Sequence, residues 1–232
     1  MNNKIIQNAY KARSGFEKKV DILVVGSGGR EHAIVWKLLQ SPRAGKLYCA
    51  PGNGGISELA ECMPIKAMDI DGIVAFCHEK HIDLAFVAPD DPLAAGMVDA
   101  LEAAGIRAFG PNKAAARIEA SKVFSKDLMK KYNIPTAAYE VFDNSDEAIK
   151  YLKTTTYPTV VKADGLALGK GVIIAPDFET AKAAVESIMN DRIFGNAGRL
   201  LVIEEFLTGK EVSILAFTDG STLMPMVSSQ DH

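Results

Sequence analysis

The glycine-rich stretch at residues 162–172, KADGLALGKGV, contains residue types that bind phosphate. Glycines let backbone N–H groups approach phosphate oxygens, and lysine ammonium groups neutralise their charge. The stretch is not a Walker A loop, because its glycine spacing differs and neither Ser nor Thr follows the second lysine. Apolar runs on both sides predict strands, so we expect a hairpin that closes over a triphosphate; a surface hairpin with solvated lysines is the alternative. The residues concerned are Lys162, Gly165, Gly169, Lys170 and Gly171.

Carboxylates follow a later predicted strand, in VIEEFLTGKEVS. Glu204 and Glu205 end an apolar run, and Glu211 lies further along. Carboxylates accept hydrogen bonds from an adenine amino group or from ribose hydroxyls, while the strand backbone can read the edge of the base. Lys162 also ends an apolar run, PTVVK, where a structural strand needs no charge. These features favour a nucleotide site; solvated charges on an edge strand are the alternative.

A second glycine cluster, GSGGREHA, precedes a predicted helix. Gly26 and Gly28 match the start of the dinucleotide-binding fingerprint, but Glu31 replaces its third glycine and the next strand, KLYCA, ends without an acidic residue. We therefore exclude a dinucleotide site. A glycine turn before a helix still offers N–H groups to an anion, and Arg30 adds a bidentate phosphate donor. We predict an anion site, with a plain turn and a solvated arginine as the alternative.

The elements that position these loops alternate between apolar strands and helices over residues 20–118. This alternation predicts a doubly wound parallel sheet of the α/β class, with ligands at the loops GSGG, APGNGG and APDDP. We expect one helix over residues 93–105, with a stripe of Leu93, Met97 and Leu101 that Gly105 closes. The expected strands are residues 20–25, 46–50, 83–88 and 106–110, and the first expected helix is residues 30–40.

The pattern of predicted elements changes in the second half of the chain. We expect one helix over residues 116–135 that Pro135 ends, and two further helices that Ser145 and Asp177 cap. The chain stops at MPMVSSQDH without an element that completes its sheet, which favours a fragment. The expected strands are residues 137–142, 158–163, 171–176, 199–207 and 211–218. The expected divisions are a disordered leader at residues 1–19, one domain at residues 20–118, and a truncated α+β domain at residues 119–232 with a lid subdomain at about residues 135–192.

The composition excludes several classes of function. A net charge of −3 over 232 residues argues against a nucleic-acid-binding surface. The apolar runs fall short of the about 20 residues that a membrane helix needs. Cys49, Cys62 and Cys77 are odd in number and lack CxxC spacing, so we predict reduced thiols in a cytoplasmic protein, without a disulfide or zinc site. His78 and His81 are expected at the surface rather than as ligands.

Five motifs in this order resemble the phosphoribosylamine–glycine ligase (glycinamide ribonucleotide synthetase) family of the ATP-grasp superfamily. They are VVGSGGREHAIVWKL, CAPGNGGI, KADGLALGKGV, VIEEFLTGKEVS and PMVSSQDH. The resemblance covers residues 20–232 and implies a Rossmann-like substrate domain followed by a partial ATP-grasp domain. It also implies ATP-dependent ligation of glycine to 5-phosphoribosylamine, through glycyl phosphate, in purine synthesis.

The resemblance implies roles for individual residues. Lys122 and Lys162 would hold the ATP phosphates as catalytic residues, under a mobile lid formed by the glycines. The implied ATP-binding residues are Lys122, Lys162, Gly165, Gly169, Lys170, Gly171, Glu204, Glu205, Phe206, Leu207 and Glu211. The implied residues near phosphoribosylamine are Gly28, Gly29, Arg30, Glu31, Asn53, Asp90 and Asp231.

The resemblance also points to what the chain lacks. The family binds Mg²⁺ or Mn²⁺ through residues beyond residue 232, so no metal ligand is expected here and the missing C-terminal half could be a separate chain. We therefore expect little or no activity from this chain alone. The family's GPEAPL loop reads APDDPL here, and the shorter Asp90 puts its reach to the substrate in question. Two alternatives stay open: another ATP-grasp or biotin-carboxylase-type enzyme, and a non-catalytic nucleotide-binding fragment.

Overall fold

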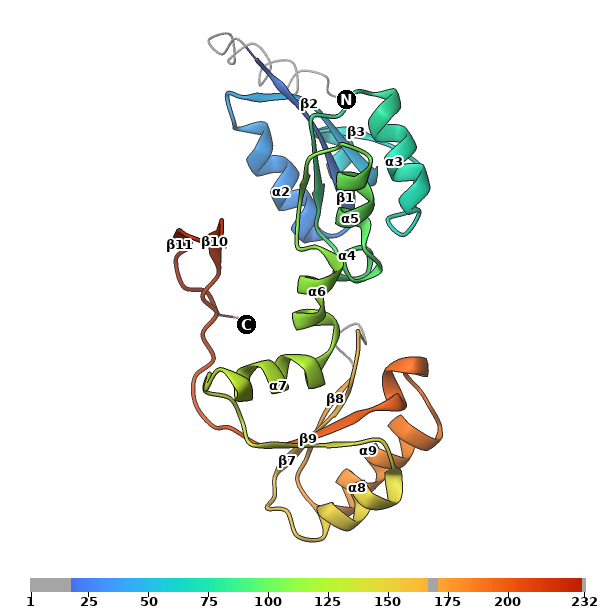
Figure 1. The fold of residues 1–232 in the computed structure, drawn as a ribbon, viewed down its shortest axis with the longest axis vertical. Helices are drawn as coiled ribbons and strands as arrows, with labels where there is room; N and C mark the ends of the chain where they lie inside the picture. Colours follow the sequence, from blue (N-terminus) through green and yellow to red (C-terminus); the bar gives the residue numbers. More distant parts are fainter. Residues whose placement is uncertain (1–17, 167–170, 231–232) are drawn as a thin grey trace.

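The computed structural model describes residues 18–166 and 171–230. Most of the expected leader, residues 1–17, lies outside this range, as do the predicted site residues Gly169, Lys170 and Asp231. The described chain forms a body with a parallel sheet and a body with an antiparallel sheet (Figure 1). Helices α6 (Lys113–Ala120) and α7 (Lys122–Lys131) connect the two.

The first body contains a five-stranded parallel sheet, as the alternation of strands and helices predicts. In β1, Ile22 and Val24 pack with Val35 of helix α2, whereas Leu23 and Val25 pack in the cluster beneath helices α3 and α5. A strand that is covered on both faces has no polar alternation, which is why residues 22–25 form a continuous apolar run. The strands, in sheet order, are β3 (Glu61–Cys62), β2 (Ala44–Pro51), β1 (Val20–Gly26), β4 (Leu84–Val87) and β5 (Ala108–Phe109). The helices are α2 (Gly29–Leu39), η1 (Ile56–Glu58), α3 (Ile70–Glu79), α4 (Asp90–Ala95) and α5 (Met97–Ala103).

The single helix expected over residues 93–105 is wrong, because α4 and α5 are separate. Gly96 between them has a φ of 99° and donates its N–H to Pro92 O and Leu93 O, both at 3.1 Å. A left-handed residue ends a helix and redirects the chain, and glycine adopts this conformation without a Cβ clash. The expected stripe is nevertheless buried on both sides of the break, and Gly105 follows α5 with a φ of 74°.

The single helix expected over residues 116–135 is also wrong. Ser121 adopts extended backbone angles between α6 and α7, and its hydroxyl accepts the N–H of Phe124 at 3.1 Å. Serine competes for backbone N–H groups in this way, which makes it a good first cap and a poor interior residue. The residues on both sides of Ser121 favour helix, so the local sequence does not reveal this break.

The second body contains a four-stranded antiparallel sheet between two layers of helix (Figure 1). Helices α8 (Ser145–Leu152) and α9 (Phe178–Val185) cover one face and share a core with Val161, Ala163 and Ile203. Helix α7 lies over the opposite face. The strands, in sheet order, are β6 (Tyr139–Phe142), β9 (Leu201–Glu205), β7 (Thr159–Ala163) and β8 (Val172–Ala175). The predicted α/β body followed by an α+β body is confirmed.

Of the two helix caps predicted in this body, one is confirmed and the other is wrong. Asp177 caps α9 by accepting the Thr180 N–H at 2.8 Å, as expected. The cap of α8 is Asn144 rather than Ser145, because the Asn144 side-chain oxygen accepts two N–H groups of the first turn, at 2.9 and 3.1 Å. After α9 the chain makes one π-helical turn, η2 (Glu186–Asn190), and one 3₁₀ segment, η3 (Gly195–Arg199).

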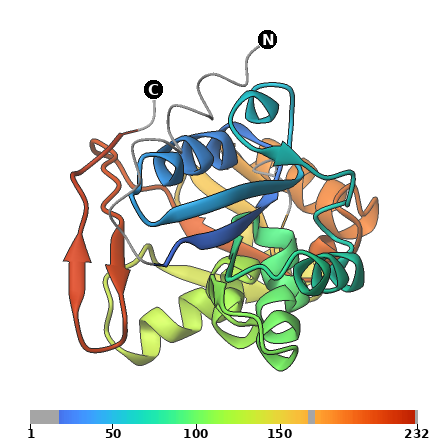
Figure 2. The same ribbon diagram turned by 90° about the horizontal axis from the view of Figure 1, so that it is seen from above.

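The strand expected over residues 211–218 is mostly absent from the described structure. Only β10 (Ala216–Thr218) forms, and it pairs with β11 (Leu223–Pro225) in a hairpin that stands at the edge of the molecule in both views (Figures 1 and 2). An isolated bridge between Ser213 and Ser229 ties its base. A strand forms where a neighbour pairs with it, and the described chain offers little of one here.

Further predictions concern single residues. Cys49 and Cys77 are buried, and burial raises the pKa of their thiols to about 12 and about 11. His78 and His81 are exposed, as expected. Within residues 18–166 and 171–230, no helix has both the length and the apolar character to cross a membrane.

Candidate functional site

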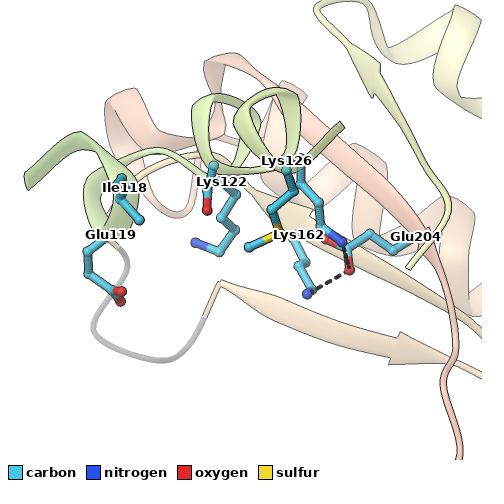
Figure 3. A pocket seen from close by; sticks show the side chains of 8 residues that line it. Ile118, Glu119, Lys122, Lys126, Lys162 and Glu204 are labelled. Atoms are coloured by element: carbon cyan, nitrogen blue, oxygen red, sulfur yellow. Dashed lines mark hydrogen bonds and ion pairs between the residues drawn. The ribbon is translucent and has the colours of Figure 1, made fainter. Parts of the chain in front are cut away.

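The candidate site lies on the face of the antiparallel sheet that turns toward α7 (Figure 3). In the register of β7 with β9, Val160 pairs with Glu204 and Lys162 pairs with Val202, so Lys162 and Glu204 are diagonal neighbours on one face. The intervening Val161 points into the core on the other face. The period of two in each strand therefore places one ammonium and one carboxylate in the same pocket.

Helix α7 contributes two more lysines to this pocket. Lys122 and Lys126 are four residues apart, so they lie on one side of the helix and extend toward the sheet (Figure 3). The pocket has a volume of about 210 Å³, with the apolar side chains of Ile118 and Met129 in its wall. Three ammonium groups beside an apolar wall suit a ligand with a polyphosphate and a flat base. The lining residues are Ile118, Glu119, Lys122, Ser125, Lys126, Met129, Lys162 and Glu204.

Glu204 is the buried centre of this group. Its Oε2 lies 2.9 Å from Lys162 Nζ and 3.1 Å from Lys126 Nζ. The side chain of Glu204 is 5% exposed, and such a carboxylate keeps its charge only with cations beside it. Lys162 therefore contacts a carboxylate in this structure and also lines the pocket.

Lys122 is held at the base of the glycine loop. Its Nζ donates to Gly165 O at 3.0 Å, so the first residue of α7 contacts the residue that begins the described part of the loop. Burial is the main cause that lowers the pKa of Lys122, and the nearby Lys162 lowers it further. A partly desolvated ammonium binds an anion more strongly than a fully hydrated one.

Asp164 fixes the start of α7 against the sheet. Its carboxylate accepts the Val123 N–H at 3.0 Å and the Ser121 hydroxyl at 3.2 Å. A carboxylate at a helix N-terminus satisfies N–H groups that have no partner within the helix and complements the helix dipole. Asp164 thereby couples the position of Lys122 to the strand that carries Lys162.

A larger cleft connects this pocket with the other body. It has a volume of about 760 Å³, and Lys122 and Glu119 line both spaces. The parallel-sheet body supplies Arg30, Glu31 and residues 88–91, and the antiparallel-sheet body supplies Gly165, Leu166, Gly171 and Val172. The predicted anion loop, the APDDP loop and the glycine loop thus open onto one space.

The buried side chain of Glu31 stabilises the GSGG turn. Its carboxylate accepts the N–H of Gly28, and the residue is 6% exposed. A Cβ on Gly26, whose φ is 131°, would lie 2.5 Å from Glu31 Cγ, so the turn accommodates Glu31 only with glycine there. Glu31 therefore shapes the turn from the place where a dinucleotide fold has its third glycine, and Arg30 is the exposed charge beside it.

Asn53 likewise connects two loops. Its side-chain amide donates to Ser27 O at 2.8 Å, and its oxygen accepts from the N–H groups of Gly55 and Ile56, both at 2.9 Å. These bonds use both acceptor positions and one of the two donors of the side chain, and they hold the PGN turn against the GSGG turn. Asp90 is the exposed first residue of α4 and lines the cleft.

The predicted residues after Glu204 do not join the pocket lining. Glu205 is exposed, and its N–H donates to Ala138 O of the segment before β6 at 3.0 Å. Phe206 and Leu207 follow the end of β9 with exposed side chains, and Glu211 is exposed on the segment toward the hairpin.

Sequence reasoning missed three residues near the site: Lys126, Asp164 and Glu119. Lys126 had a readable signal, since it lies four residues after Lys122 in a predicted helix. Asp164 stands inside the glycine stretch itself, but its bonds to α7 span 41 and 43 residues of sequence and local pattern does not reveal them. Glu119 offered no signal, because an exposed helical glutamate is common.

The described residues do not show a metal site of their own. Within residues 18–166 and 171–230, no cluster of three or more His, Cys, Asp or Glu side chains is placed to hold a metal ion.

Family models match this chain in two consecutive parts. The phosphoribosylglycinamide synthetase N domain matches residues 20–119, and the phosphoribosylglycinamide synthetase ATP-grasp (A) domain matches residues 120–232. A phosphoribosylamine–glycine ligase of Halalkalibacterium halodurans is 51% identical over 213 residues, which are 92% of this chain and 50% of the relative. The chain spans about half the length of the curated relatives it matches.

Solved structures show the same fold. The crystal structure of a phosphoribosylamine–glycine ligase from Thermotoga maritima has a TM-score of 0.74 and 30% identity, over 90% of this chain and 49% of that one. A biotin carboxylase of Campylobacter jejuni, solved as a β,γ-ATP complex, has a TM-score of 0.73 over 88% of this chain and 49% of that one. At 15% identity the second likeness concerns the fold alone.

Proposed function

This chain belongs to the phosphoribosylglycinamide synthetase family, and on that premise we propose that it carries the nucleotide-binding part of an ATP-dependent phosphoribosylamine–glycine ligase. The proposed reaction joins glycine to 5-phosphoribosylamine and gives glycinamide ribonucleotide, ADP and phosphate in purine synthesis. The convergence of Lys122, Lys162 and Gly165 beside Glu204 is the observation that supports it.

The proposed chemistry has two steps. The glycine carboxylate attacks the γ-phosphorus of ATP, so that an O–P bond forms, the bond to the β-phosphate oxygen breaks, and glycyl phosphate and ADP result. The amine of phosphoribosylamine then attacks the glycyl carbonyl carbon, so that a C–N bond forms, phosphate leaves and the amine loses a proton. Positioning and charge neutralisation can accelerate both steps without a nucleophile from the protein.

The proposed site assigns the two spaces to different substrates. The pocket beneath α7 takes the nucleotide, with Lys122 and Lys162 on the phosphates, Glu204 near the adenine amino group, and the glycine loop above. The cleft takes phosphoribosylamine, with Arg30 on its phosphate and Asp90 at the opposite wall. Glu31 and Asn53 act through the loops that they hold. The proposal includes a division of the chain into domains at residues 20–118 and 119–232, with a lid subdomain at about residues 135–192. It also includes a cytoplasmic location.

We propose that Mg²⁺ or Mn²⁺ accompanies ATP and is held mainly by residues outside this chain. The described residues form no cluster of metal ligands, so no step above is assigned to the ion. When bound, a divalent cation would neutralise phosphate charge beside the lysines.

The remainder of the family's length would complete the enzyme. We propose that this chain acts with a C-terminal half of comparable size and has little or no ligase activity alone. The test is a turnover assay with ATP, glycine and freshly prepared phosphoribosylamine, together with calorimetric titration of ATP. ATP binding without turnover is the expected result; clear turnover would refute the dependence on a second half, and absence of ATP binding would refute the nucleotide site.

A second candidate is a nucleotide-binding fragment without a catalytic role, and the grouping of all three lysines in this half favours it. Supplying the C-terminal half of the Halalkalibacterium halodurans relative separates the candidates. Restored synthesis of glycinamide ribonucleotide supports the ligase, whereas unchanged ATP binding without restored synthesis supports the fragment. Replacing phosphoribosylamine by other amines in an ADP-release assay tests the third possibility, another ATP-grasp ligase.

A further inference from the structure

The two oxygens of the buried Glu204 carboxylate differ in their contacts. Both lysines contact Oε2, at 3.1 Å for Lys126 and 2.9 Å for Lys162. The other oxygen, Oε1, is buried and has no hydrogen-bond partner within the described residues. Two cations on a single carboxylate exceed what its charge requires, so one of them can leave without exposing a bare buried anion.

The two lysines are held very differently. Lys126 Nζ also lies 2.7 Å from Thr136 Oγ1 and 3.4 Å from Ala137 O, so each of its three N–H donors has an acceptor. Its side chain is 11% exposed, and its Nζ lies 5.5 Å from the centre of the Tyr139 ring. Lys126 is therefore fixed on Glu204 by its surroundings.

Lys162 is held by fewer contacts than Lys126. Its side chain is 24% exposed, and within the described residues Glu204 is the partner that its ammonium contacts. It reaches Glu204 from β7, on the pocket side of the carboxylate (Figure 3). An ammonium with two donors left over can move to an incoming phosphate at little cost, provided that Glu204 keeps another cation.

We propose that Lys126 is a positioning residue, the permanent counter-ion of Glu204 that lets Lys162 transfer from Glu204 to a phosphate of the bound nucleotide. This inference rests on the proposed nucleotide site and adds a role for a side chain outside the predicted ATP-binding set. In this structure Glu204 contacts both lysines. With a triphosphate present, Lys162 turns to the phosphate, and Lys126 alone remains as the counter-ion that holds Glu204 in place.

The test measures the phosphate contribution to affinity, as the ratio of the Kd of adenosine to the Kd of ATP, by calorimetry on the 232-residue chain. In Lys126→Met, Lys162 becomes the sole counter-ion of a buried carboxylate and is retained there. We expect the ratio to fall about 10- to 100-fold although Lys162 is intact. Lys126→Arg, which keeps the charge, should retain most of the ratio.

The double variant Lys126→Met/Glu204→Gln distinguishes positioning from a packing role. A neutral residue 204 no longer retains Lys162, so the ratio should recover to that of Glu204→Gln alone. The loss of an adenine acceptor affects adenosine and ATP equally and cancels in the ratio. A packing role for Lys126 would weaken both ligands together and would not be relieved by Glu204→Gln.

The outcomes separate this inference from the proposed function. If the wild-type chain binds neither ATP nor adenosine, the nucleotide site itself is refuted, and the inference with it. If the wild type binds both but Lys126→Met leaves the ratio unchanged, the inference alone is refuted. Lys126→Gln, which can still bond Thr136 and Ala137, serves in the same cycle should the methionine variant not fold.

Discussion

At the scale of single residues, the site depends on how lysine charges are balanced. Lys122, Lys126 and Lys162 meet around Glu204, with Asp164 and Glu119 as the further acidic groups near Lys122. A polyphosphate in this pocket would add negative charge beside these ammonium groups, and partial burial strengthens such an interaction. The residues thus favour a polyphosphate before any ligand contact is specified.

Lys122 leads to a prediction about pH. Burial lowers its pKa below the ordinary 10.5, and a bound phosphate should raise the pKa again, because an anion favours the charged form. Between the two values, binding of ATP must take up a proton, so affinity falls as the pH rises through this range. We expect the Kd of ATP to increase in the wild type as the pH rises toward the ordinary lysine pKa of 10.5.

Lys122→Arg is the matched control, because arginine keeps its charge throughout this range. Its ATP affinity should change less with pH than that of the wild type. Titration calorimetry in two buffers of different ionisation enthalpy would measure the proton uptake directly. Parallel pH profiles for the two proteins would contradict the assignment of this proton to Lys122.

At the scale of elements, the site depends on where helices stop. The separation of α6 from α7 makes Ser121 and Asp164 the cap of α7, so that Lys122 begins a helix at the sheet rather than lying in the middle of a long one. Glu119, near the end of α6, consequently lines both the pocket and the cleft. A continuous helix would direct these side chains along one straight axis.

The other helix break gives a stability prediction. Gly96 has a φ of 99°, where a residue with a Cβ is strained, and the added atom would lie 3.3 Å from Lys113 Cδ, which can move aside. We expect Gly96→Ala to lower the free energy of unfolding by about 1–2 kcal/mol, mainly through backbone strain. Chemical denaturation monitored by circular dichroism would measure it.

Gly29→Ala provides the control for that measurement. Gly29 begins α2, and a Cβ there meets nothing within 4 Å. Since alanine favours helix more than glycine does, the variant should be neutral or slightly more stable. Equal effects of the two substitutions would show that the left-handed conformation of Gly96 is not what separates α4 from α5.

At the scale of the whole molecule, the C-terminal segment exposes apolar surface. Between residues 206 and 227 many large apolar side chains are exposed, and the β10–β11 hairpin lies at the edge of the molecule (Figures 1 and 2). Its visible anchor to the first body is Phe217, whose ring centre lies 6.2 Å from that of Phe109. An apolar stretch of this kind marks a surface that another part of a protein covers.

This surface predicts the behaviour of the isolated chain. We expect it to bind the dye ANS and to self-associate, because Val212, Ile214 and Val227 are 61%, 68% and 88% exposed. The triple substitution of these residues by serine should reduce dye fluorescence and self-association without lowering the melting temperature. Analytical ultracentrifugation and dye titration would measure both.

Ile174→Ser is the comparison for the triple variant. Ile174 is 57% exposed and lies on β8, outside residues 206–227. Its substitution should leave dye binding and association nearly unchanged. A decrease as large as that of the triple variant would mean that exposed apolar residues act additively anywhere on the chain, and that residues 206–227 form no distinct surface.

The sequence by itself determined the class of the two bodies, α/β followed by α+β, and most of their strands, but it did not predict helix α3 (Ile70–Glu79). The charged ends of two apolar runs marked Lys162 and Glu204 as site candidates, and the alternation of apolar strands with helices predicted the parallel sheet. These properties depend on the residues next to each other in the chain. The same locality explains why the sequence reading extended two helices through Gly96 and Ser121, where the break depends on what each residue contacts.

Only the tertiary structure decided how distant residues share a site. It brought Lys126 to Glu204, Asp164 to the start of α7, and Glu31 and Asn53 into the support of their loops. Contacts such as the one between Lys126 and Glu204 depend on the path of α7 over the sheet, which the packing of two bodies fixes. A side chain with a polar end can serve a ligand or a neighbouring loop equally well, and only its position in the folded chain selects between them.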